Sequence, residues 1–112
     1  MIVGKSQKDG FSILRVEGVI KLGESAQFFA EALERALNED EGHVLVDFTN
    51  INYIDSTGIG ELVGYLGRFK SIKRKLILIN PSGRIRKLLE VARLLDQFTL
   101  YDSIEEAMSL EQ

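Results

Sequence analysis

The sequence predicts an α/β fold: a mixed, mostly parallel sheet of four to five strands, with an N-terminal antiparallel hairpin and about four packed helices. Short apolar runs alternate with segments of helical periodicity, the pattern that parallel strands joined by crossover helices produce. The chain also begins with two strand-like runs separated by Asp9-Gly10, a dipeptide typical of tight hairpin turns. Its 112 residues suffice for one hydrophobic core, so a single domain spanning 1–112 is expected.

The individual elements follow from local patterns. Apolar residues recur at helical spacing in 24–37 and 57–72, whereas the apolar runs 43–48 and 75–79 lack clean alternation, as buried strands do. A capping-box pattern at Ser103 and Glu106 predicts a last short helix. Residues 18–23 are expected to form a connector with one short extended piece, and residues 49–52 a turn. The predicted order is strand 2–6, strand 11–17, helix 24–37, strand 43–48, helix 57–72, strand 75–79, helix 85–92, strand 98–101 and the short terminal helix.

Composition argues against several kinds of site. The chain has no cysteine and one histidine, His43, which excludes disulfides and multi-histidine metal sites, and no cofactor is expected. A net charge of -3 gives no case for nucleic-acid binding. No apolar run approaches the ~20 residues of a membrane span. The N-terminal stretch MIVGKSQKDG lacks the apolar centre of a signal peptide, so a cytoplasmic location is expected.

Charge is unevenly distributed along the chain. The run Glu39-Asp40-Glu41 is acidic, whereas basic residues cluster in 68–75 and again in 84–87. Such clusters are usually solvated surface, and a docking surface for a charged partner is the alternative.

The segment DSTGIGEL, residues 55–62, stands between a predicted strand and a predicted helix and has three interpretations. Asp55, Ser56 and Thr57 are all good N-cap residues, so a helix cap is expected from at least one of them. One cap needs only one residue, however. The segment could also be a phosphate-binding loop or a hydroxyl displayed for modification.

The glycines bear on the second interpretation. Gly58, Gly60 and Gly64 follow a strand and open a helix, which resembles dinucleotide sites. Asn80 and Pro81 stand where such a site would carry an acid, and no Walker sequence is present. Nucleotide binding is therefore disfavoured.

Gly60, Gly64 and Gly67 also share one helix face. Close packing of the helix on the sheet or a neighbour is the favoured explanation, and close approach by another protein is the alternative.

The third interpretation places Ser56 at the N-terminal mouth of a helix. A phosphate there would meet free backbone N–H groups and a favourable helix dipole. It would add about -1.5 to -2 charges without breaking the fold. Catalysis by Ser56 has little support, because His43 lies at the far end of the preceding strand. Asp47 and Asp55 near one sheet edge do not by themselves make a mechanism.

The chain resembles the STAS domain family, and most closely its single-domain anti-sigma factor antagonists. The resemblance covers essentially the whole chain. It is most specific in VLVDFTNINYIDSTGIGELVGYLGRFK, residues 44–70, where a strand predicted to end at Asp47 is followed by a turn and Asp-Ser-Thr-Gly-x-Gly. The tail ILINPSGRIRKLLEVARLLDQFTLYDSIEEAM, residues 77–108, is similar to the last strands and helices of the family.

This resemblance implies a STAS-like fold and a protein that is not an enzyme. The unphosphorylated form would bind an anti-sigma factor of the serine-kinase type and free a sigma factor. Phosphorylation of Ser56 would switch binding off, and a serine phosphatase would reset the protein. Asp55, Thr57 and Gly58 correspond to the recognition motif around that serine. Gly60 and Glu61 are expected in the same partner-binding surface.

Lys21 is a departure from the family pattern. Many members carry an acidic residue after the segment that corresponds to Gly18-Val19-Ile20, so Lys21 reverses the charge beside the expected partner-binding surface. This reversal keeps one alternative open, a STAS scaffold subunit of a non-sigma complex such as a stress-sensing or lipid-transport assembly. A less favoured alternative is a nucleotide-binding protein that uses the DSTGIG loop. The oligomeric state, the partner and the signal are left open.

Overall fold

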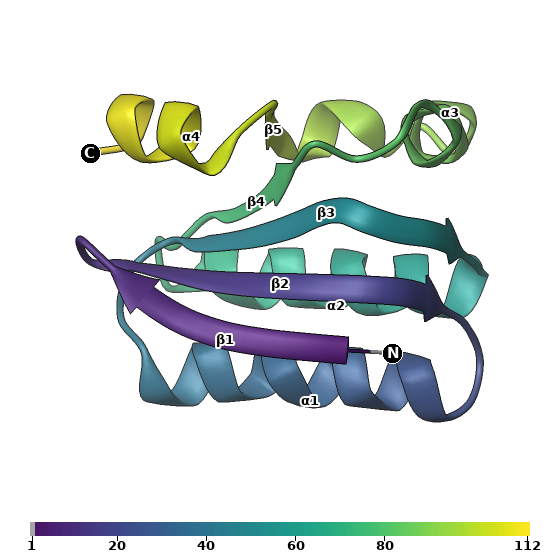
Figure 1. The fold of residues 1–112 in the computed structure, drawn as a ribbon, viewed down its shortest axis with the longest axis horizontal. Coiled ribbons are helices and arrows are strands. Elements are labelled where there is room, and N and C mark those ends of the chain that lie inside the picture. Colours follow the sequence, from purple (N-terminus) through teal and green to yellow (C-terminus); the bar gives the residue numbers. More distant parts are fainter. Residues whose placement is uncertain (1) are drawn as a thin grey trace.

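The computed structural model describes residues 2–112, with side chains from residue 3 onward, and confirms the predicted α/β fold (Figure 1). It contains β1 (Ile2–Lys8), β2 (Phe11–Ile20), α1 (Glu24–Glu39), β3 (Val44–Ile54), α2 (Ser56–Ser71), β4 (Leu76–Ile79), α3 (Gly83–Val91), the 3-10 turn η1 (Leu95–Gln97), β5 (Thr99–Tyr101) and α4 (Ile104–Leu110).

The five strands form one sheet in the order β1-β2-β3-β4-β5. β1 and β2 are antiparallel, and each later neighbour is parallel. The predicted hairpin is confirmed: Asp9 and Gly10 have φ angles of 50° and 86°. Two consecutive positive φ values match the twist of the flanking strands, which explains why Asp-Gly is found at this turn.

Helices cover the two faces of the sheet unequally. α1 and α2 lie side by side on one face, where Phe29, Phe48 and Phe69 are fully buried (Figure 1). α4 covers part of the opposite face, with Ala107 and Met108 in a smaller apolar cluster. Both faces of the central strands therefore contact apolar side chains, which explains their unbroken apolar sequences.

β3 corrects one prediction. Residues 49–52 are not a turn, because the strand continues to Ile54 beside an equally extended β2. Register shifts place extra β3 residues opposite β2, and the buried residues Phe48, Ile51 and Ile54 consequently recur every three positions. This spacing matches neither the strand period of two nor the helix period. Asp47 therefore lies within the strand rather than at its end.

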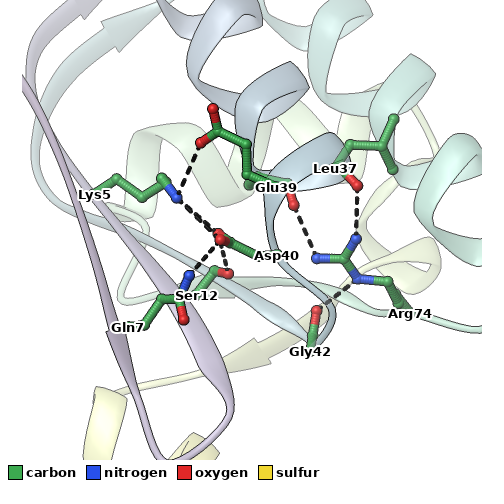
Figure 2. Close-up of polar contacts among 9 residues, drawn as sticks. Lys5, Gln7, Ser12, Leu37, Glu39, Asp40, Gly42 and Arg74 are labelled. Atoms are coloured by element: carbon green, nitrogen blue, oxygen red, sulfur yellow. Dashed lines mark hydrogen bonds and ion pairs between the residues drawn. The ribbon is translucent and has the colours of Figure 1, made fainter.

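Two polar clusters fix the C-terminal end of α1 (Figure 2). Asp40 accepts hydrogen bonds from Lys5 Nζ at 3.0 Å, from Ser12 Oγ at 2.6 Å and from the Gln7 side chain. Burial alone would raise the pKa of Asp40, but the bonds from Ser12 and Lys5 outweigh it and the pKa lies below its ordinary value. The cluster ties α1 to the N-terminal hairpin.

Arg74 forms the second cluster. Its guanidinium donates to the backbone oxygens of Ala36 at 3.1 Å, Leu37 at 3.1 Å and Gly42 at 2.7 Å (Figure 2). It also lies over the Phe69 ring, 4.8 Å from the centroid. The last carbonyls of a helix lack intrahelical partners. Arg74 supplies a donor for the Leu37 and Gly42 oxygens and a second donor for the Ala36 oxygen, which also accepts the backbone N–H of Asp40.

Candidate functional site

The segment DSTGIGEL lies where β3 passes into α2, and Asp55 is the N-cap residue of that helix. One carboxylate oxygen of Asp55 accepts a hydrogen bond from the backbone N–H of Gly58 at 3.0 Å. The predicted cap is therefore confirmed and assigned to Asp55. α2 begins at Ser56, one residue before its predicted start.

The second carboxylate oxygen of Asp55 binds a different element. It accepts a hydrogen bond at 2.8 Å from the backbone N–H of Leu22, in the loop between β2 and α1. The backbone N–H of Asp55 donates to the Ile20 carbonyl at 3.0 Å. These donors, first Leu22 and then Gly58, hold the pKa of Asp55 below its ordinary value. A single carboxylate thus connects the start of α2 to the loop before α1.

Ser56 is exposed at the first position of α2. Within residues 3–112 its hydroxyl makes no hydrogen bond, because Asp55 already caps the helix. Thr57, the next residue, is half-buried. Ser56 therefore presents a free hydroxyl beside the positive end of a helix dipole.

Gly58 is buried, and its neighbours account for the missing side chain. A Cβ atom at this position would lie 2.6 Å from Ile54 Cγ1, 2.7 Å from Ile20 Cγ2 and 3.1 Å from the Ile20 carbonyl oxygen. Only glycine lets the first turn of α2 approach the ends of β2 and β3 this closely. Gly58 thereby fixes the position of Ser56 relative to the sheet.

The glycine face of α2 corrects another expectation. Gly60, Gly64 and Gly67 are exposed, and a Cβ atom at each would meet nothing within 4 Å. The favoured explanation, close packing on the sheet or a neighbour, is wrong for this face. The outer surface of α2 is instead bare backbone that extends away from Ser56, with Glu61 half-buried beside it.

The loop that Asp55 holds carries apolar residues that sequence reasoning missed. The side chain of Leu22 is 76% exposed, and that of Phe28 on α1 is 49% exposed. Together with the predicted site residue Lys21 they line one open concavity of about 350 Å³. The adjacent Phe28-Phe29 pair was the available signal, because neighbouring helix residues cannot both face the core.

Groups for catalysis are not gathered at this site. His43 precedes β3 and Ser56 follows it, so the whole length of this 11-residue strand separates the two side chains. Asp47 is occupied by the backbone N–H and the hydroxyl of Thr49. Among the described residues no group of three or more metal-binding side chains occurs. The described helices include none that is both long and apolar enough to cross a membrane.

The fold and the site together define an α/β protein that presents an exposed serine at the capped N-terminus of α2. The chain belongs to the STAS domain family, whose model matches residues 4–107.

Three comparisons illustrate the similarity. The anti-sigma-B factor antagonist of Listeria monocytogenes is 39% identical over 67 residues, which cover 59% of this chain and 58% of that protein. The match therefore spans less than two thirds of the relative's own length. Among solved structures, a candidate anti-sigma factor antagonist from Thermotoga maritima has a TM-score of 0.87 and 23% identity, covering 96% of this chain and 92% of the other. The Bacillus cell fate determinant SpoIIAA in its phosphorylated form has a TM-score of 0.77 and 18% identity, covering 99% and 100%.

Proposed function

We propose that this protein is an anti-sigma factor antagonist whose partner binding is switched off by phosphorylation of Ser56. The observation that carries the proposal is that the cap of α2 and the exposed hydroxyl belong to two different residues. Asp55 caps α2, so the exposed Ser56 hydroxyl has no structural task within residues 3–112. Its modification would therefore leave the fold intact. The anti-sigma factor antagonists among the relatives support the partner class.

The proposed partner surface surrounds Ser56. Leu22, whose N–H binds Asp55, and Tyr53 at the end of β3 expose large apolar side chains. The bare glycine face of α2 provides a neighbouring surface on which another backbone could approach closely. Lys21 places a cation on the loop next to Leu22, and we expect a carboxylate of the partner to face it.

Phosphorylation would act on this surface by charge. A phosphoserine carries about -1.5 to -2 charges at neutral pH, and a docked partner would have to remove that charge from water. Asp55 and Glu61 lie nearby, and their negative charges would add to the repulsion between the phosphate and the partner. The N–H groups at the start of α2 would keep the phosphate compatible with the folded chain. The modified protein would thus stay folded and lose its partner.

The remaining parts of the proposal follow from this role. The partner would be an anti-sigma factor of the serine-kinase type, which binds the unmodified chain and uses ATP to phosphorylate it. A serine phosphatase would restore the binding form, and the cycle would run in the cytoplasm. The chain itself would act by binding rather than catalysis and would need no cofactor.

The test measures binding of purified variants to the serine-kinase anti-sigma factors of the host cell by titration calorimetry. Ser56→Ala should bind like the unmodified protein, and Ser56→Asp should bind at least about tenfold more weakly, a loss of 1.4 kcal/mol. Ser109→Asp is the matched control, because Ser109 is an exposed serine on α4. It adds the same charge away from the proposed surface and should bind normally.

Two results would count against the proposal. If Ser56→Asp binds as tightly as the unmodified chain, the switch is wrong and a constitutive STAS scaffold becomes the better account. If no anti-sigma factor binds any variant while the isolated chain binds ATP or GTP tightly, a nucleotide-binding function replaces it.

A further inference from the structure

A cationic cavity lies at the other end of α2, far from Ser56. It has a volume of about 330 Å³ and lies between the last turns of α2 and the starts of β4 and β5. Because α2 has 16 residues, it spans about 24 Å at 1.5 Å per residue, so the cavity is independent of the proposed partner surface. Its volume is in the range of small-ligand sites.

The lining of this cavity combines apolar and positively charged side chains. Leu66 and Leu76 supply apolar surface, and four Lys or Arg residues together with His43 surround them. Among the described residues that line it there is no aspartate or glutamate, although the whole chain has 17 acidic and 14 basic residues. The charge of the cavity is therefore opposite in sign to that of the chain.

Two of the four cations are already occupied. Arg74 donates through all three of its nitrogens to carbonyls at and just beyond the end of α1. Lys75 Nζ pairs with Glu111 at 2.7 Å. Lys70 and Lys73 form no ion pair within residues 3–112, and their charges remain available. A helix C-terminus favours nearby cations, but this does not explain the apolar surface that lines the same cavity.

Lys73 has an unusual backbone conformation for a residue other than glycine. Its φ angle is 61°, and the N–H groups of Lys73 and Arg74 donate to the carbonyls of Lys70 and Phe69. This is the left-handed position that ends many helices, where glycine is favoured and any other residue is strained. Lysine therefore brings a charge to the cavity at the expense of stability.

His43 adds a hydrogen-bond donor. Its Nδ1 accepts the backbone N–H of Lys75 at 3.0 Å, so the proton of the neutral ring resides on Nε2. Gln97 and Thr99, also in the lining, offer further polar groups. The cavity is thus lined by two lysines without an ion pair, an imidazole ring and an apolar surface.

We propose that this cavity binds a small organic phosphate monoester with an apolar or aromatic body. The phosphate dianion would lie between Lys70 and Lys73, and the body would cover Leu66 and Leu76. Two ammonium groups match a dianion better than a singly charged group, and the apolar surface favours an ester over inorganic phosphate.

The test is a nuclear magnetic resonance titration of the full chain with phenyl phosphate, inorganic phosphate and benzyl alcohol. Phenyl phosphate should produce saturable shifts at Leu66, Leu76 and His43. Inorganic phosphate lacks the body and benzyl alcohol lacks the charge, so each should bind at least about tenfold more weakly.

Variants make the assignment specific. The double variant Lys70→Met with Lys73→Gly should lose at least about tenfold in affinity and remain folded, because glycine suits the left-handed position. Lys87→Met is the matched control, since Lys87 is exposed on α3 beside Glu90. Equal binding by the double variant, or equal binding of inorganic phosphate or benzyl alcohol, would overturn the proposal.

Discussion

The carboxylate of Asp55 accepts a hydrogen bond from the backbone N–H of Leu22 at 2.8 Å while it also caps α2 through Gly58. The helix mouth that presents Ser56 and the loop that presents Lys21 therefore share one anchoring residue. The two parts of the proposed partner surface are held in register by this carboxylate rather than by the hydroxyls beside it.

Asp55→Ser should separate these two tasks. A serine can accept the hydrogen bond of the cap but does not have a second oxygen for Leu22. We expect α2 to remain capped and the amide of Leu22 to exchange its hydrogen faster. Hydrogen exchange followed by nuclear magnetic resonance measures this. Asp102→Ser, which alters an exposed carboxylate paired with Arg86, is the control and should leave Leu22 unchanged.

Two glycine-to-alanine substitutions in α2 should have opposite effects. Gly58→Ala should destabilise the protein by about 1–3 kcal/mol, because the new Cβ would overlap Ile54 and Ile20. Gly64→Ala, whose Cβ meets nothing within 4 Å, should stabilise it by about 0.5–1 kcal/mol. Urea denaturation measures both. If Gly58→Ala is as stable as the unmodified chain, the close contact with Ile20 and Ile54 does not require glycine at position 58.

The stabilised Gly64→Ala protein also tests the glycine face as a contact surface. Its affinity for the anti-sigma factor should fall although its fold is stronger, because a methyl group separates the two backbones. Unchanged affinity would remove the glycine face from the proposed surface.

Arg74→Met should destabilise the protein by about 2–4 kcal/mol. The substitution removes the guanidinium donor from the largely buried carbonyls of Leu37 and Gly42, and it leaves the Ala36 carbonyl with only the backbone N–H of Asp40. Arg74→Lys should recover only part of the loss, because an ammonium group cannot reproduce the planar guanidinium. Arg84→Met, at an exposed position of α3, is the control for loss of one charge. A loss in Arg74→Met no larger than in this control would contradict the capping role.

Two substitutions just after helix C-termini should stabilise the protein rather than destabilise it. Lys73 and Arg93 have φ angles of 61° and 60° after α2 and α3. Replacing either with glycine should raise the free energy of unfolding by about 1 kcal/mol, because glycine adopts this conformation without strain. Thermal and urea denaturation of Lys73→Gly and Arg93→Gly measure the gain. A decrease in both would show that the side chains contribute more than the strain removes.

Stability should depend on pH in the acid range. Hydrogen bonds from Arg68 and Tyr65 lower the pKa of Glu34 to about 2 from its ordinary 4.5. Between about pH 2 and pH 4.5 the unfolded chain therefore binds more protons than the folded chain. The contribution of Glu34 to the free energy of unfolding is complete above about pH 4.5 and declines as the pH falls towards 2. The melting temperature should fall over this range, and less steeply in Glu34→Gln. An identical profile in this variant would show that Glu34 has no part in it.

Sequence reasoning predicted the elements whose signals are local. Asp9-Gly10 specified the hairpin through its backbone preferences, and short apolar runs between helical segments specified the parallel strands. The second half of β3 was not predicted, because its register shifts depend on pairing with β2, a separate strand. These shifts give the buried residues Phe48, Ile51 and Ile54 a spacing of three, which is not the strand period. Polar residues in a strand then resemble a turn.

The candidate site shows the same division. That one of three residues would cap α2 was clear from their chemistry, but the choice of Asp55 depends on Leu22, which only the folded chain brings near. The glycine spacing revealed a shared helix face without revealing which way it points. Solvent exposure of Gly60, Gly64 and Gly67 is a tertiary property that helical periodicity alone does not determine.

The central claim is that Ser56 is the phosphorylated residue of a binding switch. Its most direct test is the intact mass of the chain purified from its native cells, across growth and stress conditions, with peptide mapping of residues 55–62. The account predicts a fraction heavier by one phosphate, about 80 Da, localised to Ser56 and changing with conditions. A Ser56 that stays unmodified under every condition, or a phosphate found only on another residue, would contradict it.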